Sequence, residues 1–416
     1  GLTEGSVTMT ADVSDAAGNA AAQVTSSAFT YDKTAPTVTL VSSNKSDGTY
    51  KASDIIPIAV LFSEDVTVDT SSGTPTITLS TGGSGSSVNF TSGSGTTLLT
   101  FNYTVASGHN SNDLAYSASN SLALNSATIK DSAGNDATLT LPSPSEAASL
   151  SFNKDIVIDT TSPTMTITSS TSGVSDGSTT KDATISLTFT SSEATTNFTD
   201  ADITVINGAI SGFNPASSTT YTATFTPTTD GATTVDVAGN VFTDAVGNNN
   251  TAATQFNWTY DSTPPIISAI GTGAFSWGAV LNATEDNSNG TVSVTTSGAE
   301  DGQTVTITLN GSTYTNTVSS DATTVTITAA ALQALTDGQS YTLTADVSDA
   351  AGNAASQVTS SSFAVDTTLP SIGAIATGAF SWGTHLNATE DNSNGTVGVT
   401  TVGVEDGQTV TITLNG

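Results

Sequence analysis

Hydrophobic and polar residues alternate in short runs along most of the chain. The pattern is clearest between residues 266 and 366, where turn sequences such as EDNSNG and GAEDGQ separate β-rich segments. Alternation with a period of two places one face of a strand against a core and the other in solvent. The predicted strands are 266–283, 291–297, 303–310, 313–318, 323–330, 340–348 and 355–366, with one helical turn at AALQAL.

Seven short strands in about 100 residues are typical of an immunoglobulin-like β-sandwich. Composition favours the same class, because Thr and Val are abundant and suit a pleated, half-buried surface. Cysteine is absent, which excludes a disulfide framework. The longest apolar run, IIPIAVLF at 55–62, suits a buried strand and is too short for a membrane helix. We therefore expect an all-β chain without membrane insertion.

Internal repeats indicate several such units in a row. Residues 271–311 and 376–416 are identical at 35 of 41 positions, and a sequence of the form Asp-x-x-x-Pro begins at Asp32, Asp159, Asp261 and Asp366. Proline favours a stiff, extended joint there. The predicted architecture is a tandem array of seven-stranded immunoglobulin-like sandwiches that forms an elongated rod. Its expected parts are the C-terminal half of a repeat at 1–35, whole domains at 36–160, 161–262 and 263–367, and the N-terminal half of a repeat at 368–416. The chain is expected to be a piece of a longer array.

Four sequence motifs resemble those of a known family. These are the DTTxP joints, LNATEDN, EDGQTVTITLNG and TADVSDAAGN. They are similar to the bacterial immunoglobulin-like repeats of giant secreted adhesins and biofilm-associated surface proteins. The resemblance covers essentially the whole chain and implies tandem sandwiches, export to the bacterial cell surface and, in many members, calcium at the joints.

The pentapeptide DAAGN at 15–19 and 349–353 has close copies, DSAGN at 131–135 and DAVGN at 244–248. In a sandwich whose strands alternate in direction, this loop follows the sixth strand and returns to the pole where its own domain begins. From Asn353 to Asp366 the chain spans roughly 43 Å if extended, about the length of a domain. Each loop is therefore predicted to meet the linker before its domain, together with an acid that follows the second strand.

Strand order thus predicts one group of oxygen ligands at each joint. The groups are Asp32, Glu64, Asp131 and Asn135; Asp159, Glu193, Asp244 and Asn248; Asp261, Glu300, Asp301, Asp349 and Asn353; and Asp366 with Glu405 and Asp406. Calcium takes about 6 to 8 oxygen ligands and tolerates irregular geometry, whereas magnesium demands a tighter octahedron and transition metals favour His or Cys. Several calcium ions, at the joints between domains, are therefore the expected cofactor.

A simpler interpretation of DAAGN is a turn in which Asp accepts main-chain hydrogen bonds and Gly adopts a positive φ. The turn and the metal site are compatible. The similar DVAGN at 236–240 is expected to lie in a strand, so the motif alone does not make a site. Glu285 and Asp286 could add ligands at the next joint or form a solvated turn, and Trp277 and Trp382, which recur in AFSWG, are expected to pack in a core or support a joint.

The formal net charge of -31, from 37 acidic and 6 basic residues, excludes nucleic acid as an expected partner. The two histidines fall in different repeats, and no metalloprotease or phosphate-binding motif is present, so an enzyme is not expected. The expected function is a calcium-stiffened extracellular stalk in cell adhesion or biofilm formation, with neighbouring domains of the same chain as partners. The alternative is a structural subunit of an extracellular filament, sheath or surface layer, in which identical chains pack together.

Overall fold

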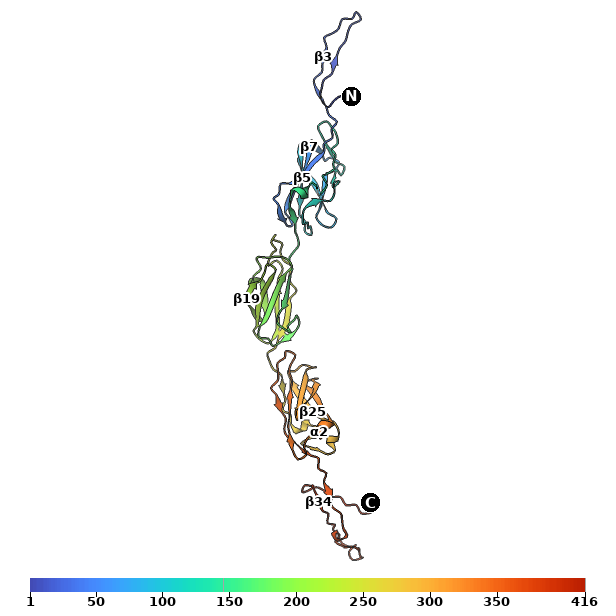
Figure 1. Cartoon of the computed structure of the whole chain (residues 1–416), viewed down its shortest axis with the longest axis vertical. Helices are drawn as coiled ribbons and strands as arrows, with labels where there is room; N and C mark the ends of the chain where they lie inside the picture. Colours follow the sequence, from blue (N-terminus) through green and yellow to red (C-terminus); the bar gives the residue numbers. More distant parts are fainter. Residues whose placement is uncertain (145, 416) are drawn as a thin grey trace.

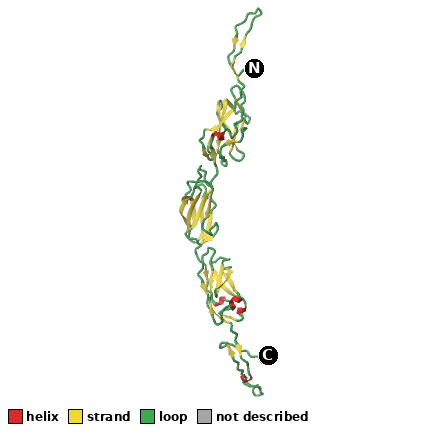
Figure 2. Cartoon of the chain, in the orientation of Figure 1, coloured by secondary structure: helices red, strands yellow, loops and turns green. Residues whose placement is uncertain are grey.

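The computed structural model describes residues 1–144 and 146–415, and it shows three β-sheet modules in a row (Figure 1). Strands and loops make up nearly all of each module (Figure 2). Among the described residues, the α-helices are the short α1 (Leu150–Asn153) and α2 (Ala329–Gln333). The prediction of an all-β, elongated chain is confirmed.

Each module has its own hydrophobic core, formed by the buried faces of alternating strands. In β28, Ala322–Ile327, every second residue is buried, and Val325 and Ile327 are fully enclosed. The three cores share no residue: one draws on residues 41–158, one on 165–258 and one on 267–365. Because each core is closed within its module, contacts between modules are confined to the poles where the linkers lie.

The first module contains an eight-stranded sheet whose main path runs β11-β8-β9-β10-β7-β13, with β12 paired to β8 and β5 to β7. The predicted buried run 55–62 lies in its longest strand, β7. The strands are β5 Val38–Ser43, β6 Gly48–Tyr50, β7 Ile55–Asp69, β8 Thr76–Ser80, β9 Ser86–Ser92, β10 Thr96–Thr104, β11 Ala115–Tyr116, β12 Leu122–Ala123, β13 Thr128–Lys130 and β14 Ile156–Ile158.

The second module is a sandwich of two four-stranded sheets, in the orders β15-β17-β20-β19 and β16-β22-β21-β18. Trp258 of β22 lies in its core, at 2% exposure. The strands are β15 Met165–Ser169, β16 Thr179–Thr180, β17 Ile185–Ser191, β18 Ile203–Ile206, β19 Gly208–Pro215, β20 Thr220–Pro227, β21 Gly231–Val237 and β22 Phe256–Tyr260.

The third module divides its residues among more strands than the seven that the sequence predicts. The predicted strand 266–283 is broken by a 3-10 turn at Thr272–Ala274, and its buried Phe275 and Trp277 pack into the core instead of continuing the strand. The predicted strands 340–348 and 355–366 are each split in two. The strands are β23 Ile266–Ile267, β24 Val280–Asn282, β25 Gly290–Ser297, β26 Thr304–Leu309, β27 Ser312–Thr317, β28 Ala322–Ile327, β29 Ser340–Tyr341, β30 Leu343–Asp346, β31 Val358–Thr359 and β32 Phe363–Asp366.

Short two-stranded ladders lie beyond the three modules. Those on the N-terminal side pair β1 (Gly5–Val7) with β4 (Phe29–Tyr31) and β2 (Thr10–Ala11) with β3 (Val24–Thr25). On the C-terminal side β33 (Ser371–Ile372) pairs with β34 (Thr401–Val402). Most residues of both segments are exposed, in contrast to the three closed cores.

In every module a short N-terminal strand runs parallel to the last strand, which leads into the linker. The pairs are β6 with β14, β16 with β22 and β24 with β32. The pairing delivers each linker Asp to a fixed place at the end of its module: the main-chain N–H of Asp159 donates to the oxygen of Tyr50 at 2.9 Å, and that of Asp261 to the oxygen of Thr180 at 3.0 Å. The linkers therefore leave the modules in a defined direction.

Candidate metal centres

The DAAGN-type loops are turns closed by their own Asp and Asn side chains. In the loop at 244–248, Oδ1 of Asp244 accepts the main-chain N–H groups of Val246, Gly247 and Asn248 at 2.7 to 2.9 Å, and Oδ2 accepts the Asn248 side-chain amide at 2.8 Å. The Asp and Asn form the same pair of bonds in the other three copies. The turn interpretation of the motif is therefore correct in its local geometry.

The same Asn side chains also bond to the linker that precedes their module. The Nδ2 atoms of Asn135, Asn248 and Asn353 donate to the main-chain oxygens of the linker Asp at 3.3, 3.1 and 2.8 Å, respectively. The acceptors are Asp32, Asp159 and Asp261. One amide thus closes its own loop and fastens that loop to the chain segment entering the module.

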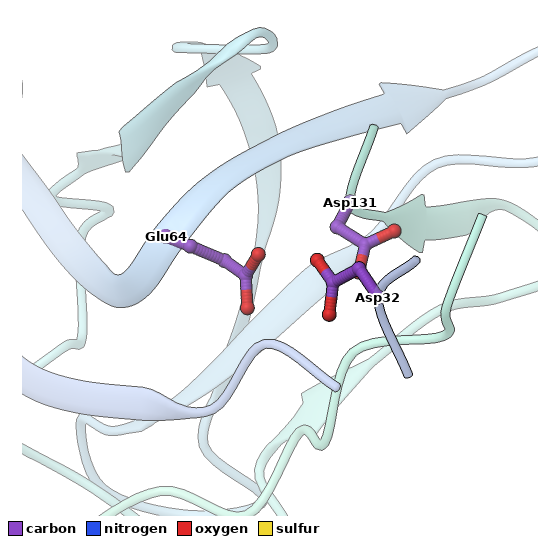
Figure 3. A group of neighbouring side chains, drawn as sticks. All are labelled: Asp32, Glu64 and Asp131. Atoms are coloured by element: carbon purple, nitrogen blue, oxygen red, sulfur yellow. The ribbon is translucent and has the colours of Figure 1, made fainter. Parts of the chain in front are cut away.

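Three carboxylates converge at the first joint (Figure 3). Asp32 comes from the linker, Glu64 from β7 and Asp131 from the loop after β13, and their ligand atoms all lie within 4.8 Å of one another. Asp131 is 5% exposed, while the other two are half-buried. The nearby Lys130 does not neutralise the group, because its ammonium pairs with Asp136 at 2.7 Å.

The second joint repeats this arrangement with different sequence around it. Asp159 of the linker, Glu193 after β17 and Asp244 of the loop after β21 again place their ligand atoms within 4.8 Å of one another. Asp244 is buried, at 6% exposure. At both joints the linker Asp uses Oδ1 to accept the main-chain N–H of the residue two positions later, at 3.0 Å. This turn orients the linker carboxylate toward the following module.

Close approach of like charges changes the proton affinities at both joints. The pKa of Glu64 is raised by burial and then by the charges of Asp32 and Asp131. The pKa of Glu193 is raised by burial, by the charges of Asp159 and Asp244 and by a hydrogen bond with Asp244. For Asp131, burial acts to raise the pKa, but the hydrogen bonds from Asn135 and neighbouring main-chain groups outweigh it, so the pKa is lowered. A divalent cation between these carboxylates would remove the repulsion.

The third joint has the same bond from the loop Asn to the linker Asp, but among the described residues its acids do not form a group within 4.8 Å. Oε2 of Glu300 accepts the main-chain N–H of Ala350 at 2.8 Å, which brings Glu300 to the loop of Asp349 and Asn353. Oδ1 of Asp301 instead accepts the N–H of Ser320 at 2.7 Å, in a different turn. In the part of the chain that the structure describes, the acid groups within 4.8 Å are those of the first two joints.

At the fourth joint, Asp366 and Glu405 line one hollow, whereas Asp406 is not among its lining residues. Asp366 and Glu285 share a larger hollow on the same side, next to Leu369 and Pro370. Glu285 uses Oε2 to accept the N–H of Asn282 at 3.1 Å and so closes its own turn. The structure therefore places Asp366 and one of its two predicted partners, Glu405, on the wall of the same hollow.

Sequence reasoning missed a set of acids that precede three of the four linkers in the chain and accept hydrogen bonds from them. Asp230 accepts the N–H of Ser262 at 2.9 Å and the hydroxyl of Thr263 at 2.5 Å, and Asp337 accepts the N–H of Thr367 at 2.8 Å. Glu4 bonds the first linker in the same way. In each case the acid is followed by a glycine with positive φ, so the repeated acid-glycine pair was the signal that could have found them.

Two family profiles match the chain. One, described as a bacterial Ig-like domain, matches residues 159–260, and the other, a bacterial Ig-like domain of group 3, matches 219–367. Together they span 159–367, about half of the chain. The comparison with curated protein sequences gives no match.

Among solved structures, a bacterial immunoglobulin-like domain from the M. primoryensis ice-binding adhesin is 32% identical over 24% of this chain and 95% of its own, with a TM-score of 0.19. A Ca2+-stabilized adhesin by which an Antarctic bacterium binds ice is 22% identical over 86% of this chain and 81% of its own, with a TM-score of 0.28. A 1.5-MDa bacterial ice-binding adhesin is 21% identical over 77% of this chain and 94% of its own, with a TM-score of 0.29. On the matches of the two family profiles, the chain belongs to the bacterial immunoglobulin-like domain family.

Proposed function

We propose that the chain is part of the stalk of a bacterial surface adhesin, and that calcium stiffens the stalk by binding at the joints. The observation that carries this proposal is the pair of three-carboxylate groups, each of which combines a linker Asp with two acids of the following module. A cation held there would be bonded to both sides of a joint. Residues far apart in the chain would then move as one body.

Calcium fits the donor set better than other common metals. At the second joint the available donors are the carboxylates of Asp159, Glu193 and Asp244, and water would complete the shell. Calcium accepts 6 to 8 oxygens at about 2.3 to 2.6 Å, and carboxylates that come from different elements need not meet a strict geometry. The four predicted joints are all proposed as sites, and the first two have the most complete sets of ligands in the described residues.

The mechanical role follows from charge. Three clustered carboxylates repel one another without a cation, which favours separation of the linker from the module that follows it. A bound dication offsets most of this charge and favours the closed joint. Repeated along the chain, the effect converts a row of hinged modules into a rod that holds an adhesive tip away from the cell, in adhesion or biofilm formation.

An extracellular location is part of the proposal. The family is bacterial, and the calcium sites of extracellular modules typically have dissociation constants of about 10⁻⁴ to 10⁻³ M. Within the described residues, no helix is both long and apolar enough to cross a membrane. The role we propose is mechanical, with the neighbouring modules as partners of each site.

Small-angle X-ray scattering of the whole chain, in calcium and in chelator, tests the stiffening. Calcium is expected to lengthen the maximum dimension and narrow the spread of conformations, and isothermal titration is expected to detect binding. The variant Asp244→Asn should weaken binding at the second joint. Asp236→Asn is the matched control, because Asp236 belongs to the similar sequence DVAGN but lies in β21. An unchanged scattering profile together with no measurable calcium binding would overturn the proposal.

A further inference from the structure

Two lysines cross the joints and bond to the module that follows. Nζ of Lys51 donates to the main-chain oxygen of Gly247 at 2.8 Å, across a sequence separation of 196 residues. Nζ of Lys181 donates in the same way to the main-chain oxygen of Gly352. Both acceptors are the glycines of DAAGN-type loops, so the two contacts are equivalent.

The position of each lysine is set by the parallel strand pair at the end of its module. Lys51 directly follows Tyr50, whose main-chain oxygen accepts the N–H of the linker residue Asp159. Lys181 directly follows Thr180, which accepts the N–H of Asp261 in the same way. Each lysine therefore stands beside the linker where it leaves the module. From there its four-carbon side chain reaches the loop of the next module.

The loop glycine suits this contact in two respects. Gly247 has a φ of +96°, which favours glycine, and a Cβ atom at this position would lie 2.8 Å from Nζ of Lys51. Its N–H already donates to Oδ1 of Asp244 at 2.7 Å, inside the loop. Its carbonyl oxygen remains as an acceptor for the ammonium. Gly352, with a φ of +85°, likewise lies against the end of Lys181.

The ammonium groups of Lys51 and Lys181 bond to main-chain carbonyl oxygens and not to carboxylates. Among the described residues, the ion pairs join Lys130 to Asp136 and Lys154 to Asp47. The chain has only 6 basic residues against 37 acidic ones, and two of them cross joints. In the third module the residue opposite the linker acid Asp366 is Asn282, whose Oδ1 accepts N–H groups of its own turn. The third module thus has Asn282 at the position that Lys51 and Lys181 occupy in the first two modules.

We infer that Lys51 and Lys181 are interdomain latches that hold the following module in a fixed orientation without a cation. The linker alone is one attachment and leaves bending and twisting free, whereas a second attachment beside it restricts both. A hydrogen bond from an ammonium group is about twice as strong as a neutral one. The latch extends the stiffening proposed above but does not depend on calcium.

The latch and the proposed cation act on different atoms of the same loop. The Asp244 carboxylate belongs to the cation site, while the carbonyl of Gly247 receives Lys51. Because both contacts favour one orientation of the second module, they are expected to be coupled, and loss of either one should weaken the other. The joint after the third module, which has Asn282 in place of lysine, should depend more strongly on its cation.

The absence of native cysteine allows a direct test by spin labelling of the whole chain. Labels on Thr104→Cys and Thr190→Cys report the second joint, because both residues are exposed and lie on strands of adjoining modules. Distance distributions are measured by double electron–electron resonance, in chelator and in calcium. The test variant is Lys51→Met, and Lys51→Arg retains a charged donor. The control is Lys45→Met, which removes a lysine that lies over the Tyr50 ring.

In chelator, Lys51→Met is expected to broaden the distribution and to lower the population of the native orientation about tenfold, equivalent to the loss of one charged hydrogen bond. Lys51→Arg should restore most of the population, and Lys45→Met should leave it unchanged. Equal distributions for Lys51→Met and Lys45→Met in chelator would overturn the latch. If calcium has no effect on the unmodified joint while Lys51→Met still broadens it, the calcium proposal fails and the latch stands.

Discussion

The side-chain amide of Asn248 donates a hydrogen bond of 3.1 Å to the main-chain oxygen of Asp159, which lies 89 residues earlier in the chain. The same amide donates to Oδ2 of Asp244 at 2.8 Å. One short side chain therefore completes a turn and fastens the linker to it. The first and third joints have the same bond, from Asn135 and Asn353.

Replacement of this amide is expected to loosen the second joint. Asn248→Ala leaves Oδ2 of the buried Asp244 and the oxygen of Asp159 without a donor, which costs about 1 to 3 kcal/mol in the free energy of local opening. Hydrogen exchange of the loop amides at 246–248, measured in chelator, should therefore accelerate. Asn257→Ala removes an exposed amide on β22 and serves as the control. Equal exchange in the two variants would contradict the role assigned to Asn248.

The relation of each loop to the preceding linker could be predicted because it depends only on strand direction and chain length. An extended segment from Asn353 to Asp366 carries the chain to the far pole, whatever the side chains are. The strand count was less predictable. Phe275 and Trp277 lie in a segment whose hydrophobic and polar residues alternate as in a strand. Their rings instead stack in the core, with centroids 5.3 Å apart, and a 3-10 turn in the backbone precedes them.

Side-chain direction could not be predicted. Glu300 and Asp301 are adjacent acids, yet one accepts the N–H of Ala350 and the other that of Ser320, because neighbouring residues point to different sides of a turn. The contact of Lys51 with Gly247 was also beyond sequence reasoning. It depends on how two modules are oriented, and a single lysine carries no periodic signal.

Glu193→Gln should have opposite effects with and without calcium. In chelator the substitution removes one of three mutually repelling carboxylates, so the free energy of unfolding of the second module should increase. In calcium the site loses a charged ligand, and binding at the second joint should weaken at least tenfold, roughly the loss of one charged contact. Thermal unfolding and calcium titration measure the two effects. The group of Asp32, Glu64 and Asp131 is an internal control and should keep its affinity.

In chelator, the free energy of unfolding should depend on pH, because the pKa values of Glu64 and Glu193 are raised in the folded chain. Between the ordinary glutamate value of 4.5 and the raised value, the folded chain binds more protons than the unfolded chain. Stability should therefore increase as the pH falls through the raised pKa and decrease as the pH rises through it. Asp131, with its lowered pKa, acts oppositely, but only at or below its ordinary value of 3.8.

Calcium should reverse this pH dependence, because protons compete with the ion for the same carboxylates. Unfolding midpoints measured in chelator and in calcium, at intervals from neutral pH to about pH 5, provide the comparison. The double variant Glu64→Gln and Glu193→Gln should flatten the curve in chelator. A slope that persists in the double variant would show that other groups produce it.

The last prediction concerns the core of the third module, where Trp277 packs directly against the backbone of Gly290. A Cβ atom at Gly290 would lie 2.5 and 2.7 Å from ring carbons of Trp277 and 3.0 Å from Leu332. The indole cannot move aside freely, because Phe275 stacks on it at 5.3 Å and Phe363 meets it edge-on at the same distance. Gly290→Ala should therefore lower the free energy of unfolding by about 1 to 3 kcal/mol, which is typical of an overpacked core.

Gly273→Ala is the matched control, because a Cβ atom there meets nothing within 4 Å. Calorimetry should show a lower melting temperature of the third module in Gly290→Ala only, by roughly 4 to 8 °C for each kcal/mol lost in a domain of this size. Gly395 has the same relation to Trp382, with a Cβ-to-ring distance of 2.4 Å. The recurrence of this Gly–Trp contact in two repeats indicates that AFSWG is a packing motif. Equal melting of the two glycine variants would refute that interpretation and leave the tryptophan available for another role.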